Sequence, residues 1–214
     1  MPPHRGLIRP SNGYPRYGET RGYAIYRVKS EWGDRGPKSV LTVMEVTGLD
    51  AAAERALWEW LAGMDLIRTI AAWRQPVPPP LFLQLQDPRR LGLMVGDGLW
   101  VRLVDLPAAL AARSYTGPGE LTLDVADTFM PANAGTWSLR VPGDRGEASV
   151  VRAATGAEPD LRLDTTDLAA VYLGGFTFAD LARAGRLGEC RDGAIAAADR
   201  LFATTGVAWS STMF

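Results

Sequence analysis

The clearest pattern of apolar and polar positions lies between Asp97 and Tyr115. Within residues 99–104, leucine and valine at every second position alternate with a tryptophan, an arginine and a valine, and a period of two predicts a strand with one apolar face. Asp105 then stands where its side chain can cap a helix, and Pro107 lies in the first turn, where a missing N–H costs nothing. The segment predicts a strand, a turn and a helix, and we interpret it as the start of a domain.

The residues before this segment predict a β-β-α-β unit. Residues 22–28 and 39–46 are typical of two neighbouring strands. Asp50 can cap a helix that runs to about Gly63 with its apolar side chains on one face. Residues 65–73 are apolar on both sides and predict a strand that returns to the same sheet.

Irregular segments flank this unit. Residues 1–20 show no periodicity and predict an irregular N-terminal arm. The Gly- and Pro-rich residues 33–37 predict a loop between the first two strands. Residues 80–86 predict a short helical turn that ends at Asp87 and Pro88.

After residue 115, strand-like segments come before helical ones. Four short segments predict an antiparallel meander: residues 120–126, 135–141, 148–153 and 161–164. Three helices are predicted to follow, over residues 166–173, 177–184 and 192–203. Gly174 and Gly175 are typical of a helix end, and Thr177 with Asp180 has the spacing of a capping box. Strands grouped before helices are typical of the α+β class.

Composition argues against some classes of partner. The 214 residues carry a net charge of −1, the isoelectric point is near 5.9, and the arginines are scattered along the chain, so no nucleic-acid partner is expected. No apolar run approaches the ~20 residues that cross a bilayer, and the first residues lack the apolar core of a signal peptide. We therefore expect no membrane span and a cytoplasmic location.

Histidine and cysteine are too scarce for several kinds of site. The sequence contains one histidine, His4, and one cysteine, Cys190. It therefore has too few of these residues for an internal disulfide, a cysteine cluster, or a histidine-based metal site or catalytic triad. No metal is expected. Arg186 and Arg191 stand near Cys190 and can lower a thiol pKa, but no base lies near it in the sequence. An ordinary loop residue is the preferred interpretation of Cys190.

Three further candidates compete with simpler structural roles. Residues 89–94 have some of the basic and glycine spacing that holds the pyrophosphate of coenzyme A, but Met94 stands where a small residue is needed. Tryptophans such as Trp100 and Trp137 could line an apolar ligand cavity, although core packing is the simpler explanation. Five aspartates are candidates for general acid–base catalysis, although helix capping or solvation is the simpler explanation of their positions. They are Asp124, Asp127, Asp160, Asp164 and Asp167.

The last residue, Phe214, is a candidate of another kind. An α-carboxylate normally stays in water, but burial of the attached ring in a pocket would desolvate the carboxylate, and desolvation raises a carboxyl pKa toward the strength of a useful base. The alternative is that this end of the chain merely frays.

Several blocks, taken in order and spacing across most of the chain, resemble the enhanced intracellular survival (Eis) family of GNAT-related N-acetyltransferases. The blocks are residues 22–27, 54–58, 65–69, 87–89, 99–105, 109–115, 172–175, 181–185 and Phe214. Proteins of that family combine an N-terminal GNAT domain that binds acetyl-CoA, a central GNAT-like domain and a C-terminal domain similar to sterol carrier protein 2.

The resemblance implies an assignment for each part of this chain. Residues 21–95 correspond to a partial central GNAT-like domain, and residues 97–214 to the sterol carrier protein 2-like domain. The acetyl-CoA site and the tyrosine that acts as general acid belong to the domain that has no counterpart here. Phe214 is the retained catalytic position, because the family uses its C-terminal carboxylate as general base. Met213 departs from the acidic residue of some members, which puts a polycationic acceptor in doubt.

Three functional hypotheses result. In the favoured one, the chain is a fragment, the C-terminal portion of an Eis-type acetyl-CoA-dependent N-acetyltransferase for aminoglycoside- or lysine-type amines, and it is inactive without the N-terminal domain. In the second, it is a non-catalytic, sterol-carrier-like module that binds an apolar ligand. In the third, it is an oligomerisation module, because family members form symmetric oligomers; a complete protein is then expected to be a homo-oligomer.

Overall fold

The computed structural model describes residues 4–7, 20–143 and 147–211. The chain forms two compact units. Unit 1 contains the residues up to Leu93 together with those from Trp209 onward, and unit 2 contains Met94–Ala208. The chain therefore returns to unit 1 after it has completed unit 2.

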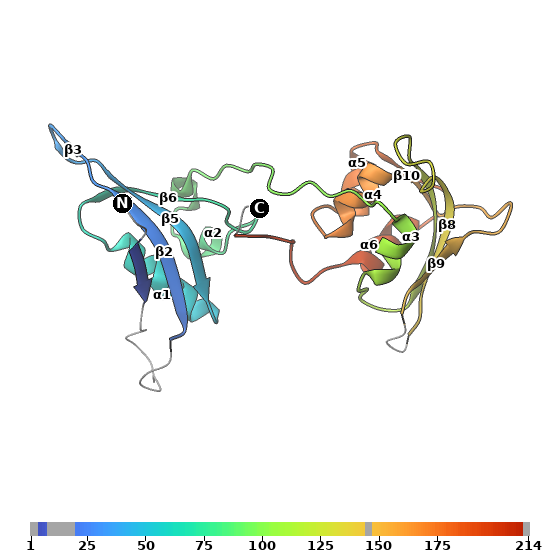
Figure 1. Ribbon diagram of the computed structural model, residues 1–214, viewed down its shortest axis with the longest axis horizontal. Helices are drawn as coiled ribbons and strands as arrows, with labels where there is room; N and C mark the ends of the chain where they lie inside the picture. The colour runs from blue at the N-terminus through green and yellow to red at the C-terminus, as the bar shows by residue number, and fades with distance from the viewer. Residues whose placement is uncertain (1–3, 8–19, 144–146, 212–214) are drawn as a thin grey trace. The chain divides into compact units, whose positions relative to one another are not determined.

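Unit 1 is a four-stranded sheet with one helix against it (Figure 1). The strand order is β1-β2-β5-β6, in which β1, β2 and β5 are antiparallel and β6 is parallel to β5. The bounds are His4–Leu7 for β1, Gly22–Lys29 for β2, Ser39–Gly48 for β5, Ile67–Ala72 for β6 and Ala51–Ala62 for helix α1. The predicted β-β-α-β unit is confirmed.

Helix α1 forms where its cap and its apolar face predict it. The Asp50 side chain accepts a hydrogen bond from the Ala53 N–H at 2.8 Å, and the helix ends at Gly63. Leu57 and Leu61 are buried against Leu41 of β5. Burying each such side chain contributes about 1.5–3 kcal/mol, so this small core fixes the helix on the sheet.

Short elements appear where the sequence predicts irregular structure. His4–Leu7 pair with β2 as strand β1, although residues 1–20 lack any periodic pattern. Residues of the predicted loop contribute to a small hairpin of β3 (Trp32–Gly33) and β4 (Gly36–Pro37). The expected helical turn is α2 (Leu81–Gln84), followed by the 3-10 turn η1 (Pro88–Leu91).

Unit 2 is a five-stranded sheet with four helices on one face (Figure 1). The strand order is β11-β10-β7-β8-β9. The strands are β7 (Gly119–Ala126), β8 (Gly135–Val141), β9 (Ser149–Arg152), β10 (Leu161–Asp164) and β11 (Leu187–Glu189). The helices are α3 (Leu106–Ala112), α4 (Thr165–Tyr172), α5 (Phe178–Arg183) and α6 (Ala194–Phe202).

One strand direction in unit 2 differs from the prediction. Strands β7, β8 and β9 form the expected antiparallel meander, but β10 runs parallel to β7, with Leu161 opposite Leu123. The alternation of apolar residues decides which face of a strand is buried, and it does not decide the strand's direction. The α+β class is correct, and the purely antiparallel sheet is wrong.

The predicted strand over residues 99–104 is also wrong. This segment forms no strand, and Leu99 and Trp100 are 62% and 84% exposed, whereas Leu103 is buried in the core of unit 2. A strand needs a neighbour for its backbone groups as well as an alternating pattern. The helix after it is confirmed: Asp105 accepts from the Ala108 N–H at 3.0 Å at the start of α3.

Candidate functional site

The C-terminal segment is attached to unit 1 by a hydrogen bond from a tryptophan ring. The Trp209 Nε1–H donates to the backbone carbonyl of Arg74 at 2.6 Å. Arg74 lies two residues after the end of the edge strand β6. Phe214, the predicted general base, lies outside the described residues. The Trp209–Arg74 hydrogen bond is therefore a described contact between the C-terminal segment and unit 1.

Arg74 has two unusual features at this point. Its φ is 52°, a conformation that residues other than glycine adopt rarely. Its side-chain Nε is buried and has no hydrogen-bond partner among the described residues. A buried donor without an acceptor is uncommon and calls for an explanation.

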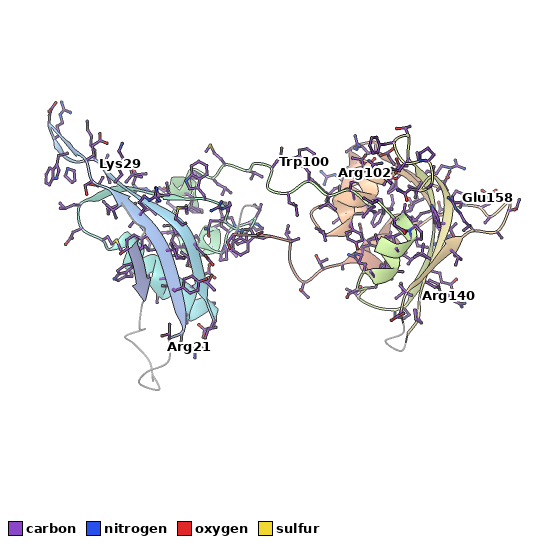
Figure 2. All side chains as sticks on the ribbon, in the orientation of Figure 1. Arg21, Lys29, Trp100, Arg102, Arg140 and Glu158 are labelled. Carbon is purple, nitrogen blue, oxygen red and sulfur yellow. The ribbon has the colours of Figure 1, made fainter. Side chains whose placement is uncertain are left out.

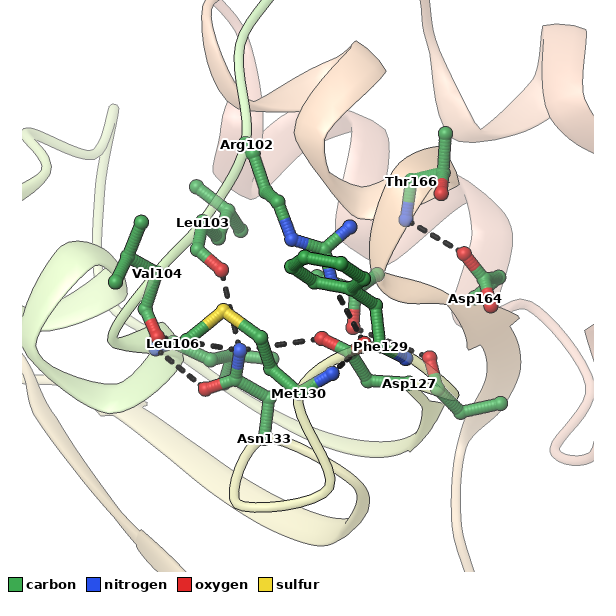
Figure 3. Close-up of polar contacts among 12 residues, drawn as sticks. Arg102, Leu103, Val104, Leu106, Asp127, Phe129, Met130, Asn133, Asp164 and Thr166 are labelled. Carbon is green, nitrogen blue, oxygen red and sulfur yellow. Dashed lines mark hydrogen bonds and ion pairs between the residues drawn. The ribbon is translucent and has the colours of Figure 1, made fainter.

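Unit 2 contains a buried polar cluster at the point where the chain enters it (Figure 3). The Asn133 side-chain amide donates to the carbonyls of Leu103 and Val104 at 3.1 and 3.3 Å, and its oxygen accepts from the Leu106 N–H at 3.1 Å. The same amide donates to Asp127 at 3.2 Å. Asn133 thus fixes the residues that lead into α3.

Asp127 is the charged centre of this cluster. Its carboxylate accepts from the backbone N–H groups of Phe129 and Met130 at 3.0 and 2.8 Å. It also forms an ion pair with Arg102 at 2.6 Å, and the Arg102 guanidinium lies over the Phe129 ring. Burial acts to raise the pKa of Asp127, but these N–H donors and the Asn133 amide outweigh it and lower the pKa to about 2. The carboxylate is permanently charged at neutral pH and is suited to structural anchoring.

The other candidate aspartates have structural partners as well. Asp164 caps α4, and Asp160 accepts from the Thr122 N–H and pairs with Arg191. Asp167 pairs with Arg186 at 2.5 Å and Asp124 with Arg162 at 3.3 Å. The contacts favour capping and ion pairing over acid–base chemistry for this group.

Helix N-termini are the usual cradles for phosphate, and those of α1, α3, α4, α5 and α6 hold this chain's own side chains. Asp50, Asp105 and Asp164 cap α1, α3 and α4. The carboxylate of Asp199 accepts from two N–H groups at the start of α5, and that of Glu189 accepts from the Ile195 N–H in the first turn of α6.

The segment that resembles a pyrophosphate loop forms a capped turn. Asp87 accepts from the Arg89 N–H and pairs with Arg90 at 3.6 Å, and Met94 is 89% exposed. No group of histidine, cysteine, aspartate or glutamate suited to a metal occurs in the described ranges.

A pocket of about 300 Å³ lies in unit 2 between the end of α4, the start of α5 and the residues after α6. Apolar side chains make up most of its lining, and Asp199 adds a carboxylate. The apolar side chains are those of Val171, Phe176, Phe178, Phe202 and Val207. Trp100 and Trp137, the candidates for a cavity lining, are not among its lining residues. Trp137 is buried and donates to the Asn133 carbonyl at 2.7 Å, and Trp100 is exposed (Figure 2).

Two remaining expectations concern Cys190 and the bilayer. Cys190 is an exposed free thiol, as expected for a loop residue. In the part of the chain that the structure describes, none of the helices combines the length and the apolar character needed to cross a bilayer.

Comparisons with known proteins agree with this two-part organisation. A GNAT acetyltransferase domain model matches residues 12–103, and a sterol carrier protein domain model matches residues 106–211. An uncharacterized N-acetyltransferase of Streptomyces coelicolor is 41% identical over 194 residues, which are 91% of this chain and 46% of that protein. The chain carries a GNAT acetyltransferase domain followed by a sterol carrier protein domain, and its relatives include Eis-type N-acetyltransferases.

Two further relatives support this assignment. The N-acetyltransferase Eis of Mycobacterium tuberculosis is 31% identical over 169 residues, which are 78% of this chain and 38% of that protein. The crystal structure of Eis1 from Mycobacterium abscessus matches with a TM-score of 0.73 and 36% identity, over 90% of this chain and 48% of that one. This Eis-like chain spans about half the length of the curated relatives that it matches.

Some residues of the Eis-like chain could not be singled out from the sequence. Arg74 and Trp209 carry no motif, and their contact joins positions 135 residues apart. Asn133 lies in a predicted turn, where asparagine is ordinary. A single sequence gives no signal that distinguishes these three residues from others of their types.

Proposed function

We propose that this chain carries the acceptor-side part of an acetyl-CoA-dependent N-acetyltransferase, with the α-carboxylate of Phe214 as general base. In this role the carboxylate accepts a proton from the acceptor amine. Residues 21–95 serve as a partial central GNAT-like domain, and residues 97–214 as a sterol carrier protein 2-like domain that returns the C-terminus. The observation that carries the proposal is the Trp209–Arg74 hydrogen bond, because it attaches the C-terminal segment to the GNAT-like unit.

The chain is proposed to depend on further sequence for acetyl-CoA. The relatives are about twice as long as the matched region, and the helix N-termini described above already hold the chain's own carboxylates or hydroxyls. Both observations support an acetyl-CoA site in the part of such a protein that this chain does not span. The acceptor is an aminoglycoside- or lysine-type amine, the complete protein is a cytoplasmic homo-oligomer, and no metal takes part.

Isothermal titration with acetyl-CoA and a thiol-release assay test this dependence. The 214-residue chain is expected to give no binding heat at millimolar acetyl-CoA and no release of coenzyme A in the presence of an aminoglycoside or a lysine peptide. Saturable binding or turnover by the chain alone would contradict the proposal.

A second function, binding of an apolar ligand, is favoured by the pocket in unit 2. Its aromatic lining and its volume are suited to a small apolar molecule. Displacement of a fluorescent fatty acid measures this activity. We expect Phe176→Ala to weaken binding, whereas Phe129→Ala, which changes an exposed ring outside the pocket, leaves it unchanged. Equal affinities in the two variants would exclude this pocket as the binding site.

A further inference from the structure

We propose that the pocket of unit 2 binds a small apolar molecule that carries one ammonium group, with the Asp199 carboxylate as its counter-ion. This inference rests on the second function proposed above, binding of a ligand in that pocket, and it names the class of ligand. The class is a primary amine with a short alkyl chain or one aromatic ring.

The first argument is the composition of the pocket lining. Among the described residues that line it, Asp199 alone has a charged side chain. Phe178 and Phe202 are buried lining residues whose rings meet edge to face, with centroids 5.0 Å apart. A carboxylate beside aromatic rings favours a ligand that combines a positive charge with an apolar body.

The second argument is that Asp199 lacks a cationic partner in the described parts of the chain. Three other aspartates of unit 2 with poorly exposed carboxylates, Asp127, Asp160 and Asp167, each form an ion pair with an arginine. Asp199 lies on α6 and is half-buried, yet no described arginine or lysine pairs with it. A partly buried charge without a counter-ion is unfavourable, and a cationic ligand would supply the counter-ion.

The third argument is that the backbone donors beside the pocket are already used. The Asp199 carboxylate accepts from the N–H groups of Phe178 at 2.6 Å and Ala179 at 3.2 Å. These groups at the start of α5 would otherwise attract an anion. An anionic ligand therefore meets a negative charge in place of free donors. A carboxylate has about four lone-pair positions, so Asp199 can still accept from an ammonium.

Arg113 lies against the Phe202 ring, but it does not neutralise the pocket. Its guanidinium is 4.4 Å from the ring centroid, and it donates to the carbonyls of Ser114, Tyr172 and Phe202. Arg113 is not among the residues that line the pocket. The negative charge of Asp199 is therefore the charge that a ligand meets there.

Phe176 and the volume of the pocket limit the size of the ligand. Phe176 is a lining residue but is 59% exposed, so its ring is available to a ligand that enters from solvent, and the face of a ring attracts a cation. The volume of about 300 Å³ is at the lower end of the range for small-molecule sites. A small free amine fits these features better than a long-chain lipid.

Isothermal titration of the full-length chain with octylamine, octanol and octanoate tests the inference. The three probes share one alkyl chain and differ in their head groups, which at neutral pH are positive, neutral and negative. Octylamine should bind about tenfold more tightly than octanol, a difference of about 1.4 kcal/mol, because its ammonium forms a charge-assisted hydrogen bond. Octanoate should bind more weakly than octanol, because its carboxylate is repelled by Asp199.

Asp199→Asn removes the charge and keeps a side-chain oxygen for the start of α5. It should lower the affinity for octylamine to that for octanol. Asp192→Asn is the matched control, because Asp192 is exposed, lies outside the pocket lining and gives the same change of charge; it should keep the tenfold preference. Phe176→Ala should weaken binding of all three probes and keep their order. The comparison of probes on the wild type needs no variant, so the inference stays testable if Asp199→Asn does not fold.

Three outcomes would contradict the inference in different ways. Equal affinities of the wild type for octylamine and octanol would overturn it and leave an apolar pocket. An unchanged preference for octylamine in folded Asp199→Asn would overturn the role of Asp199. Absence of binding by all three probes would overturn the inference together with the second proposed function. None of these titrations involves acetyl transfer, so failure of that proposal would be seen separately.

Discussion

Asn133 is the residue on which most of the polar contacts at the entrance of unit 2 depend. Its side chain is bonded to two carbonyls, one N–H group and the Asp127 carboxylate, and the residue is only 3% exposed. Buried polar groups that lose a partner cost about 1–3 kcal/mol. Asn133 therefore stabilises unit 2 because its side chain provides hydrogen-bond partners for several buried polar groups.

Asn133→Ala is expected to lower the free energy of unfolding of unit 2 by about 2–3 kcal/mol, because the Leu106 N–H and the Leu103 carbonyl lose their partner. Calorimetry of the full chain measures the loss. Ser149→Ala, at an exposed position on β9, should change stability by less than about 0.5 kcal/mol. Equal effects of the two substitutions would contradict the role assigned to Asn133.

Asp127 makes the stability of unit 2 depend on pH. Its folded-state pKa of about 2 lies below the ordinary value of about 3.9, so the charged form is favoured by folding. The ionised Asp127 carboxylate therefore contributes to the free energy of unfolding of unit 2. This contribution is complete above about pH 5 and is lost as pH falls from about 4 to about 2. Thermal unfolding should show a difference in melting temperature between the wild type and Asp127→Asn. This difference should be largest near neutral pH and should become smaller over this acidic range. A melting-temperature difference that stays constant from pH 7 to pH 2 would show that the charge of Asp127 does not contribute to the stability of unit 2.

At the scale of elements, one arginine joins the ends of three helices. Arg113 follows α3 and donates to the carbonyls of Tyr172 at 2.9 Å and Phe202 at 2.5 Å, the last residues of α4 and α6. Its guanidinium also lies over the Phe202 ring, 4.4 Å from the centroid. A cation at helix C-termini is favoured by the helix dipole, so Arg113 stabilises the contact among these helices.

Arg113→Ala should lower the unfolding free energy of unit 2 by about 2–3 kcal/mol, from lost charge-assisted hydrogen bonds and the ring contact. Arg113→Lys should recover only part of the loss, because a lysine cannot bond both carbonyls in the same geometry. Urea unfolding monitored by circular dichroism distinguishes the three proteins. Full recovery by lysine would show that charge alone is sufficient. Arg200→Ala, at an exposed position on α6, is the control.

Elements with local signals could be predicted, and elements that depend on distant partners could not. Asp50, Asp105 and the capping box of Thr177 with Asp180 mark helix starts in the sequence, and all three are confirmed. The parallel pairing of β10 with β7 depends on how the chain crosses the sheet, which no local pattern records. The segment 99–104 shows the converse case, in which alternation is present but a neighbouring strand is not.

At the scale of the whole molecule, the family was recognisable from blocks spread along the sequence, but the geometry around Arg74 was not. The order of those blocks predicted a GNAT-like part and a sterol-carrier-like part, which the comparisons confirm as matched domains. The chain returns from unit 2 to unit 1, where Trp209 donates a hydrogen bond to the carbonyl of Arg74, a residue far from it in the sequence. The role of Phe214 remains a prediction, and it is the central claim of this account.

A chimeric enzyme tests that claim most directly. This chain would replace the matched 46% of the Streptomyces coelicolor relative, and kcat for acetyl transfer to an amine would be measured for three forms. A general base contributes about 10²–10⁴-fold, so one glycine added after Phe214, which displaces the α-carboxylate by about 3.5 Å, should lower kcat by at least about 100-fold. Phe214→Leu keeps the α-carboxylate and should retain most of the activity. Full activity in the glycine-extended chimera would contradict the assignment of the Phe214 carboxylate as general base.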